Sequence, residues 1–200
     1  MKYNTLKILG VSLDFPLAEK QISSTNNLIA LMKEHGNLYE FVDSQLYGFL
    51  RKILIVKNFH PDIKKWRFKY HLDSLVKNMR SAKAKKTINQ IPMEYDVVLQ
   101  IGSEFCLNDV NKLNNIPKFS YHDNNLIGYL KGAWSLPKLD KKVKEGLAYE
   151  RDVYNGLTGI FTMTKYLRDI FINEFHIPKE KVHYVGFGHN LSSVPDEDKN

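Results

Sequence analysis

The sequence predicts an α/β fold in which a Rossmann-like parallel sheet carries helices on both faces. Short apolar segments recur along the chain, and segments with helical spacing of their apolar residues separate them. Strands that alternate with helices in this way form a parallel sheet that is covered on both sides. The chain has 200 residues, of which 43% are hydrophobic, and this is enough for one good-sized core. We therefore expect one compact domain.

The first quarter of the chain contains two predicted strands and two predicted helices. Residues 7–13 form a short apolar run that predicts the first strand. A helix follows, with candidate capping residues at 23–25 and a stop at Gly36. Residues 37–42 are a candidate second strand. Apolar residues in 45–57 recur at helical spacing, which favours a helix there, although a strand stays open.

The segment 64–86 holds most of the positive charge. It contains nine Lys or Arg residues and one acidic residue, Asp73, so its net charge is +8 in a chain whose net charge is +7. The spacing of its apolar residues predicts that it is helical. Such a segment points to an anionic partner, and charge alone leaves open nucleic acid, an acidic membrane surface and a phosphorylated substrate. We expect the basicity to belong to one surface feature.

The rest of the chain alternates more plainly between strands and helices. The predicted strands are 95–101, 116–121, 159–163 and 182–185, and the predicted helices are 140–154 and 165–176. Thr164 is placed to cap the last of these helices, and Pro178 follows its end.

The segment 150–190 has a distinctive sequence, ER(x)7GIFTMTKYLRDIFINEFHIPKEKVHYVGFGHN. It runs from the end of the predicted helix 140–154 to just beyond the last predicted strand. It resembles the end of the N-terminal domain in GT-B glycosyltransferases of the large retaining family. The resemblance rests on Glu150, Thr164, Ile177-Pro178, Lys181-Val182 and Gly188-His189-Asn190, which match the family pattern in order and spacing. YDVVLQIGSEF and KFSYHDNN are similar to two earlier strands of the family, so the match covers roughly residues 95–190.

The resemblance implies a domain organisation and an activity. Residues 1–191 would be a Rossmann-like acceptor-binding domain, and 192–200 a linker or tail towards a C-terminal GT-B domain. The enzyme would move a sugar from a nucleotide-sugar donor to a sugar or lipid-linked acceptor. This half would need no cofactor of its own and would be inactive alone, because the donor is held mainly by the C-terminal domain. The alternative is a non-catalytic α/β module that binds an acceptor or a partner.

Five residues are candidates for the site. His122 and Asp123 follow a predicted strand at its carboxyl end, where open α/β sheets place ligands. An imidazole there can share a proton with an acceptor hydroxyl, so His122 is the candidate catalytic residue and Asp123 a candidate acceptor ligand. Glu104 is a second acceptor candidate, and a solvated loop carboxylate is an equally good interpretation of it. Gly10 and Thr164 are candidates for contact with the donor diphosphate, although capping alone also explains Thr164.

A candidate surface for anionic lipid comes from the basic segment. Trp66 can sit at the level of lipid headgroups among basic residues. A solvated charged helix face is the alternative interpretation. The candidate surface residues are Lys64, Lys65, Trp66, Arg67, Lys83, Lys85 and Lys86.

Several function classes find no support in the sequence. It contains no P-loop, GxGxxG or HExxH pattern, and its histidines form no metal pattern, so no metal site is predicted. RNP, KH and OB patterns are absent, so nucleic acid is not an expected partner.

The single cysteine, Cys106, and the lack of a secretory or membrane-spanning run indicate a cytoplasmic protein. Peripheral binding at the inner face of the membrane is compatible with this.

Overall fold

The computed structural model describes residues 6–13, 24–132 and 140–186. Six parallel strands form one sheet, in the order β2-β1-β3-β4-β5-β6. The strands are β1 (Ile8–Ser12), β2 (Leu38–Asp43), β3 (Val97–Ile101), β4 (Lys118–His122), β5 (Gly159–Thr162) and β6 (Val182–Tyr184). The fold is therefore the predicted α/β fold with a Rossmann-like parallel sheet, and all six predicted strands are confirmed.

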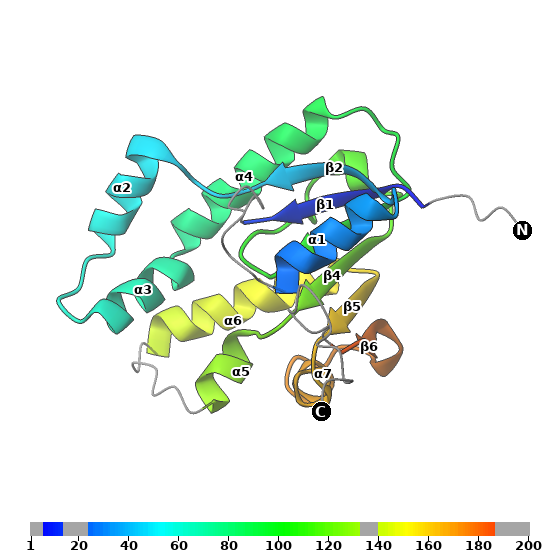
Figure 1. Cartoon of the computed structure of the whole chain (residues 1–200). Coiled ribbons are helices and arrows are strands. Elements are labelled where there is room, and N and C mark those ends of the chain that lie inside the picture. Colours follow the sequence, from blue (N-terminus) through cyan, green and yellow to red (C-terminus); the bar gives the residue numbers. More distant parts are fainter. Residues whose placement is uncertain (1–5, 14–23, 133–139, 187–200) are drawn as a thin grey trace, which may run out of the picture.

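Helices cover both faces of the sheet (Figure 1). In Figure 1, α1 lies in front of the sheet and α4 behind it, while α2 and α3 extend beyond the sheet at the left. The helices are α1 (Ser24–Glu34), α2 (Gly48–Lys57), α3 (Ile63–Leu72), α4 (Ser74–Gln90), α5 (Leu126–Lys131), α6 (Asp140–Asn155) and α7 (Lys165–Asn173), with short 3-10 turns η1 (Asn111–Leu113) and η2 (Lys179–Lys181). α5 and η1 were not predicted, because they are too short to show a helical period.

The expectation of one basic helix on one surface was wrong. Asp73 ends α3 and begins α4, and its side chain accepts hydrogen bonds from the backbone N–H groups of Leu75 and Val76. This cap turns the chain, so the two halves of the basic segment point in different directions. Lys77 and Arg80 of α4 are buried, with exposures of 4% and 1%. Only part of the positive charge is therefore on the surface.

The core lies mainly between the sheet and the helices on one of its faces. One cluster joins β1, β2 and β3 to α4, with Leu9, Val98 and Ile88 at its centre. A second cluster joins β5 and β6 to α6 and α7, with Ile160 and Phe171 at its centre. Because side chains alternate along a strand, Ser120 and His122 of β4 point to this same face.

Candidate functional site

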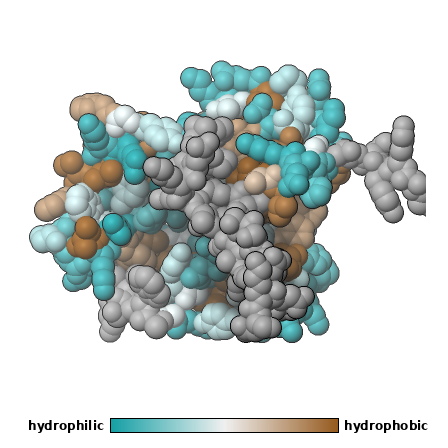
Figure 2. All heavy atoms as spheres, in the orientation of Figure 1, coloured by the Kyte–Doolittle hydropathy of each residue, from teal (hydrophilic) through white to brown (hydrophobic). Residues whose placement is uncertain are grey.

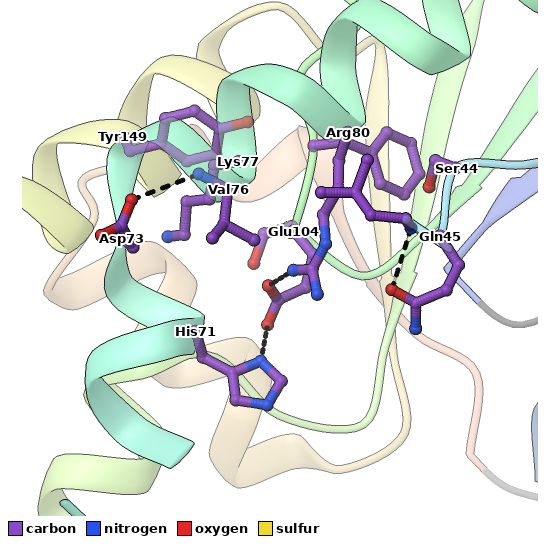
Figure 3. A network of polar contacts seen from close by, with 12 residues as sticks. Ser44, Gln45, His71, Asp73, Val76, Lys77, Arg80, Glu104 and Tyr149 are labelled. Carbon is purple, nitrogen blue, oxygen red and sulfur yellow. Dashed lines mark hydrogen bonds and ion pairs between the residues drawn. The ribbon is translucent and has the colours of Figure 1, made fainter. Parts of the chain in front are cut away.

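An arginine, a glutamate and a histidine meet just beyond the carboxyl end of β3. Arg80 of α4 donates from Nη1 to Oε2 of Glu104, at 2.6 Å, and Nδ1 of His71 lies 3.3 Å from Oε1 of the same carboxylate. Figure 3 shows Glu104 held between the two. Burial alone would raise the pKa of Glu104, but the hydrogen bond from His71 and the charges of His71, Arg80 and Lys77 outweigh it and lower this pKa to about 2. Glu104 is therefore ionised at neutral pH.

Lys77 lies beside this group with its ammonium unpaired. The Nζ atom is 4.6 Å from the ring centroid of Tyr149, and among the described residues it has neither a hydrogen bond nor an ion pair. Burial lowers the pKa of Lys77, and the nearby charges of Glu104 and Glu150 oppose that shift. Because Lys77 lines the cavity described below, an anion bound there could pair with this ammonium.

Glu150 of α6 fixes the start of α5 in the same region. Its carboxylate accepts hydrogen bonds from the Ser103 hydroxyl at 2.8 Å and from the Leu126 backbone N–H at 3.1 Å. Burial raises the pKa of Glu150, while the Lys77 charge and these hydrogen bonds act in the opposite direction. The carboxylate that carries part of the sequence resemblance thus joins the loop after β3 to the helix after β4.

These side chains border a cavity of about 460 Å³, which we call the Glu104 cavity. Both apolar and charged side chains line it. The lining residues are Lys64, Arg67, Phe68, His71, Leu72, Lys77, Glu104, Leu126, Tyr129 and Glu150. The chain crosses from β2 over β1 to β3, so the strand order reverses between β1 and β3. Open α/β sheets bind ligands beyond the carboxyl ends of their strands at such a reversal, and the Glu104 cavity borders the end of β3.

The predicted acceptor residues have different places in the structure. Glu104 lines the cavity. Asp123 is exposed and is not among the lining residues. Burial raises the pKa of Tyr129, which lines the cavity, and the charge of Asp123 adds to this shift.

His122 is buried in the core, with 1% of its surface exposed. Its ring lies 5.4 Å from that of Tyr154 and 5.2 Å from that of Phe171, and Nε2 is 2.9 Å from the hydroxyl of Ser120. Burial lowers the pKa of His122 to about 4. His122 does not line the Glu104 cavity described above. Its catalytic role stays a prediction, and the burial of the ring argues against that role.

Gly10 and Thr164, the two residues predicted to contact the donor diphosphate, each have a structural role. A Cβ atom on Gly10 would come within 2.9 Å of the Phe41 ring, so this position in β1 leaves room for a side chain of β2. The hydroxyl of Thr164 accepts a hydrogen bond from the Leu167 backbone N–H at 3.0 Å, which confirms the predicted cap of α7. Donor contact by either residue stays a prediction.

The predicted anion surface is divided among three places. Lys64 and Arg67 line the cavity. Trp66 of α3 donates from Nε1 to the carbonyl of Ile55, so it fixes α3 to α2. The α4 lysines are apart from these, because Lys83 bonds to the carbonyl of Gln45 and Lys85 pairs with Asp109 at 3.2 Å, while Lys86 is exposed.

Three residues of the site were not predicted from the sequence, namely His71, Lys77 and Arg80. A signal for Arg80 was present. Val76, Arg80, Ala84 and Ile88 recur every four residues and form one stripe of α4, and all four are buried. A single arginine within an apolar stripe indicates a buried guanidinium. No comparable signal marks His71, which depends on how α3 meets the loop after β3.

Comparison with known proteins gives no further guide to identity. No model of a known protein family matches the chain, and no curated protein matches its sequence. None of the helices in the described part of the chain is long and apolar enough to cross a membrane.

Proposed function

We propose that this chain is the acceptor-side domain of a GT-B glycosyltransferase and that the Glu104 cavity receives the acceptor. The observation that carries the proposal is the position of this cavity, beyond the end of β3 where the strand order reverses. The donor nucleotide would be held mainly by a second domain, so this domain orients the acceptor and excludes water from it.

The chemistry of the cavity wall supports a sugar ligand. Glu104 and Glu150 supply carboxylate oxygens that can accept hydrogen bonds from hydroxyl groups, and Phe68 and Tyr129 supply ring faces and edges. Because Glu104 is fixed by Arg80 and His71, its orientation is set before a ligand binds.

The unpaired ammonium of Lys77 supports an acceptor that carries a phosphate. Lys64 and Arg67 line the same cavity, so three cations can face one anionic group. A sugar phosphate, free or linked to a lipid, presents both the hydroxyls and the charge that this wall can satisfy.

Calorimetric titration of the purified chain tests the proposal. Glucose 6-phosphate, glucose and inorganic phosphate serve as probes, because together they separate the contribution of hydroxyls from that of charge. We expect the sugar phosphate to bind most tightly, and Lys77→Met and Glu104→Gln each to weaken it by about tenfold. Lys85→Met is the matched control, because this lysine lies outside the cavity. Absence of binding by all three probes, or equal binding by wild type and both cavity variants, would overturn the proposal.

The non-catalytic binding module remains the second candidate. The Glu104 cavity is lined by residues of this chain, so ligand binding needs no second domain. We expect the chain alone to hydrolyse or transfer no nucleotide sugar. A protein that combines this domain with a nucleotide-binding α/β domain should transfer sugar if it is an enzyme half, and should only bind ligand if it is a module.

A further inference from the structure

A second surface, outside the Glu104 cavity, is apolar and unusually exposed. It is formed by α2 and the turn between α2 and α3, and we call it the α2 face. Its members are large hydrophobic side chains with at least two-fifths of their surface open to solvent. They are Tyr47 (56%), Phe49 (78%), Leu50 (41%), Ile53 (47%), Val56 (70%), Phe59 (59%) and Ile63 (57%). Figure 2 shows hydrophobic residues gathered at this end of the molecule, where Figure 1 places α2 and α3.

The exposure follows from how α2 is attached. Leu54 is the buried residue of this helix, and Phe49, Ile53 and Val56 recur at i, i+4 and i+7 on a face that α3 and the sheet leave uncovered. Phe59 is fixed on the surface by an edge contact with Trp66, at 5.2 Å between ring centroids. Folded proteins rarely leave so many large apolar side chains together in water, so the face is suited to contact with something apolar.

The charges around the α2 face indicate what it contacts. Residues 48–72 contain seven Lys or Arg and one acidic residue, Asp62. A hollow of about 480 Å³ between α2 and α3 adjoins the apolar side chains through Ile63. Arg51 and Arg67 line it, together with Arg80, whose charge is already paired with Glu104. No carboxylate is among the described residues that line it. Apolar side chains beside a basic hollow match the acyl chains and phosphate headgroups of an anionic lipid surface.

We propose that the α2 face docks this protein onto an anionic membrane surface. Phe49, Ile53 and Val56 enter the acyl boundary, and Arg51 and Arg67 lie at the level of the lipid phosphates. A second copy of the chain is a poorer occupant, because two such faces would bring seven basic residues against seven. The docking site is distinct from the α4 lysines of the candidate anion surface. It places Lys64 and Arg67, which line the Glu104 cavity, beside the membrane.

Flotation with lipid vesicles tests this docking. The wild-type chain should float with vesicles that mix phosphatidylcholine and phosphatidylglycerol and should stay behind with phosphatidylcholine alone. Phe49→Ser combined with Val56→Ser should lower the bound fraction by about tenfold, and so should Arg51→Glu. Met93→Ser and Lys86→Glu are matched controls, because Met93 is exposed ahead of the amino end of β3 and Lys86 is exposed on α4.

Depth of insertion gives an independent readout. The sequence has two tryptophans, so Trp134→Phe leaves Trp66 as the reporter beside Phe59. Brominated lipids should quench Trp66 in anionic vesicles and leave it unquenched in the Phe49→Ser, Val56→Ser background.

The results of these experiments distinguish a membrane from a second copy of the chain as the partner of the α2 face. Equal flotation of wild type and the Phe49→Ser, Val56→Ser variant would overturn insertion, and flotation lost only with Lys86→Glu would restore the α4 lysines as the surface. A wild-type dimer in solution that this variant converts to a monomer would assign the α2 face to a second copy. Vesicles and sugar phosphates are separate probes. Membrane docking can therefore fail while the acceptor proposal holds, and the acceptor proposal can fail while membrane docking holds.

Discussion

Arg80 and Glu104 form a salt bridge at 2.6 Å in which the guanidinium is almost fully buried and the carboxylate faces the cavity. One partner thus belongs to the core and the other to the site. The arrangement fixes a cavity-facing carboxylate through a buried guanidinium.

The cost of breaking this pair is the first prediction. Arg80→Met keeps most of the side-chain volume but leaves Glu104 without its main donor, and we expect a loss of about 3 kcal/mol in the free energy of unfolding. Urea denaturation measures it. The double variant Arg80→Met, Glu104→Leu should recover most of the loss, and a loss that the second substitution leaves unchanged would show that Arg80 acts through packing alone.

The lowered pKa of Glu104 predicts an acid-dependent part of the stability. A carboxyl group whose pKa falls from 4.5 to about 2 on folding stabilises the folded state fully above the unfolded pKa, and this contribution is lost as the pH falls from about 5 to 2. Wild type should therefore approach Glu104→Gln in stability across this window. Denaturation of both proteins at several pH values checks it, and a constant difference between them would contradict the assignment.

The lowered pKa of His122 predicts a second pH-dependent part of the stability. Its pKa falls from 6.5 to about 4 on folding, so the unfolded state binds the extra proton between these values. Stability should then decrease as the pH falls from about 6.5 to 4, by about 2–3 kcal/mol, and His122→Asn should lack this component. Titration of the imidazole by NMR checks it directly. A measured pKa near 6.5 would mean that the ring reaches solvent, and would support the predicted catalytic role.

Gly10 gives a prediction about packing. Gly10→Ala places a methyl group 2.9 Å from the Phe41 ring, and we expect a loss of about 1–2 kcal/mol in the free energy of unfolding. Combining it with Phe41→Leu should relieve part of that loss, since the smaller side chain leaves more room. Ligand binding in the Glu104 cavity should be unchanged, which distinguishes a packing role from a donor-binding role.

Asp73 combines a helix cap with an ion pair. It accepts backbone hydrogen bonds at the start of α4 and lies 3.1 Å from Nζ of Lys57. Asp73→Ser should keep the cap and lose the pair, whereas Asp73→Ala should lose both and cost about 1 kcal/mol more. Equal thermal unfolding of the two variants would show that the cap contributes nothing measurable.

The strand pattern and most of the helices were determined by the sequence itself, whereas α5 and the break between α3 and α4 were not predicted. Apolar runs bounded by Gly, Pro and polar residues predicted all six strands, and Thr164 was predicted as a cap from its place alone. These features are local, because hydrophobic period and capping depend on residues within a few positions of one another. Glu104 was a predicted site residue for a related reason, since it follows a strand at the edge where parallel sheets bind ligands.

Only the tertiary structure decided which charges are buried. Lys77 and Lys86 are both lysines of one basic segment, yet Lys77 is buried beside the cavity and Lys86 is exposed. His122 lies in the core and His71 lies at the site for the same reason. Alternation along β4 directs His122 into the core, while the turn at Asp73 brings His71 to Glu104. The composition gives the number of charges but not which side of a helix another element covers. Which side is covered depends on contacts between residues that are far apart in the chain.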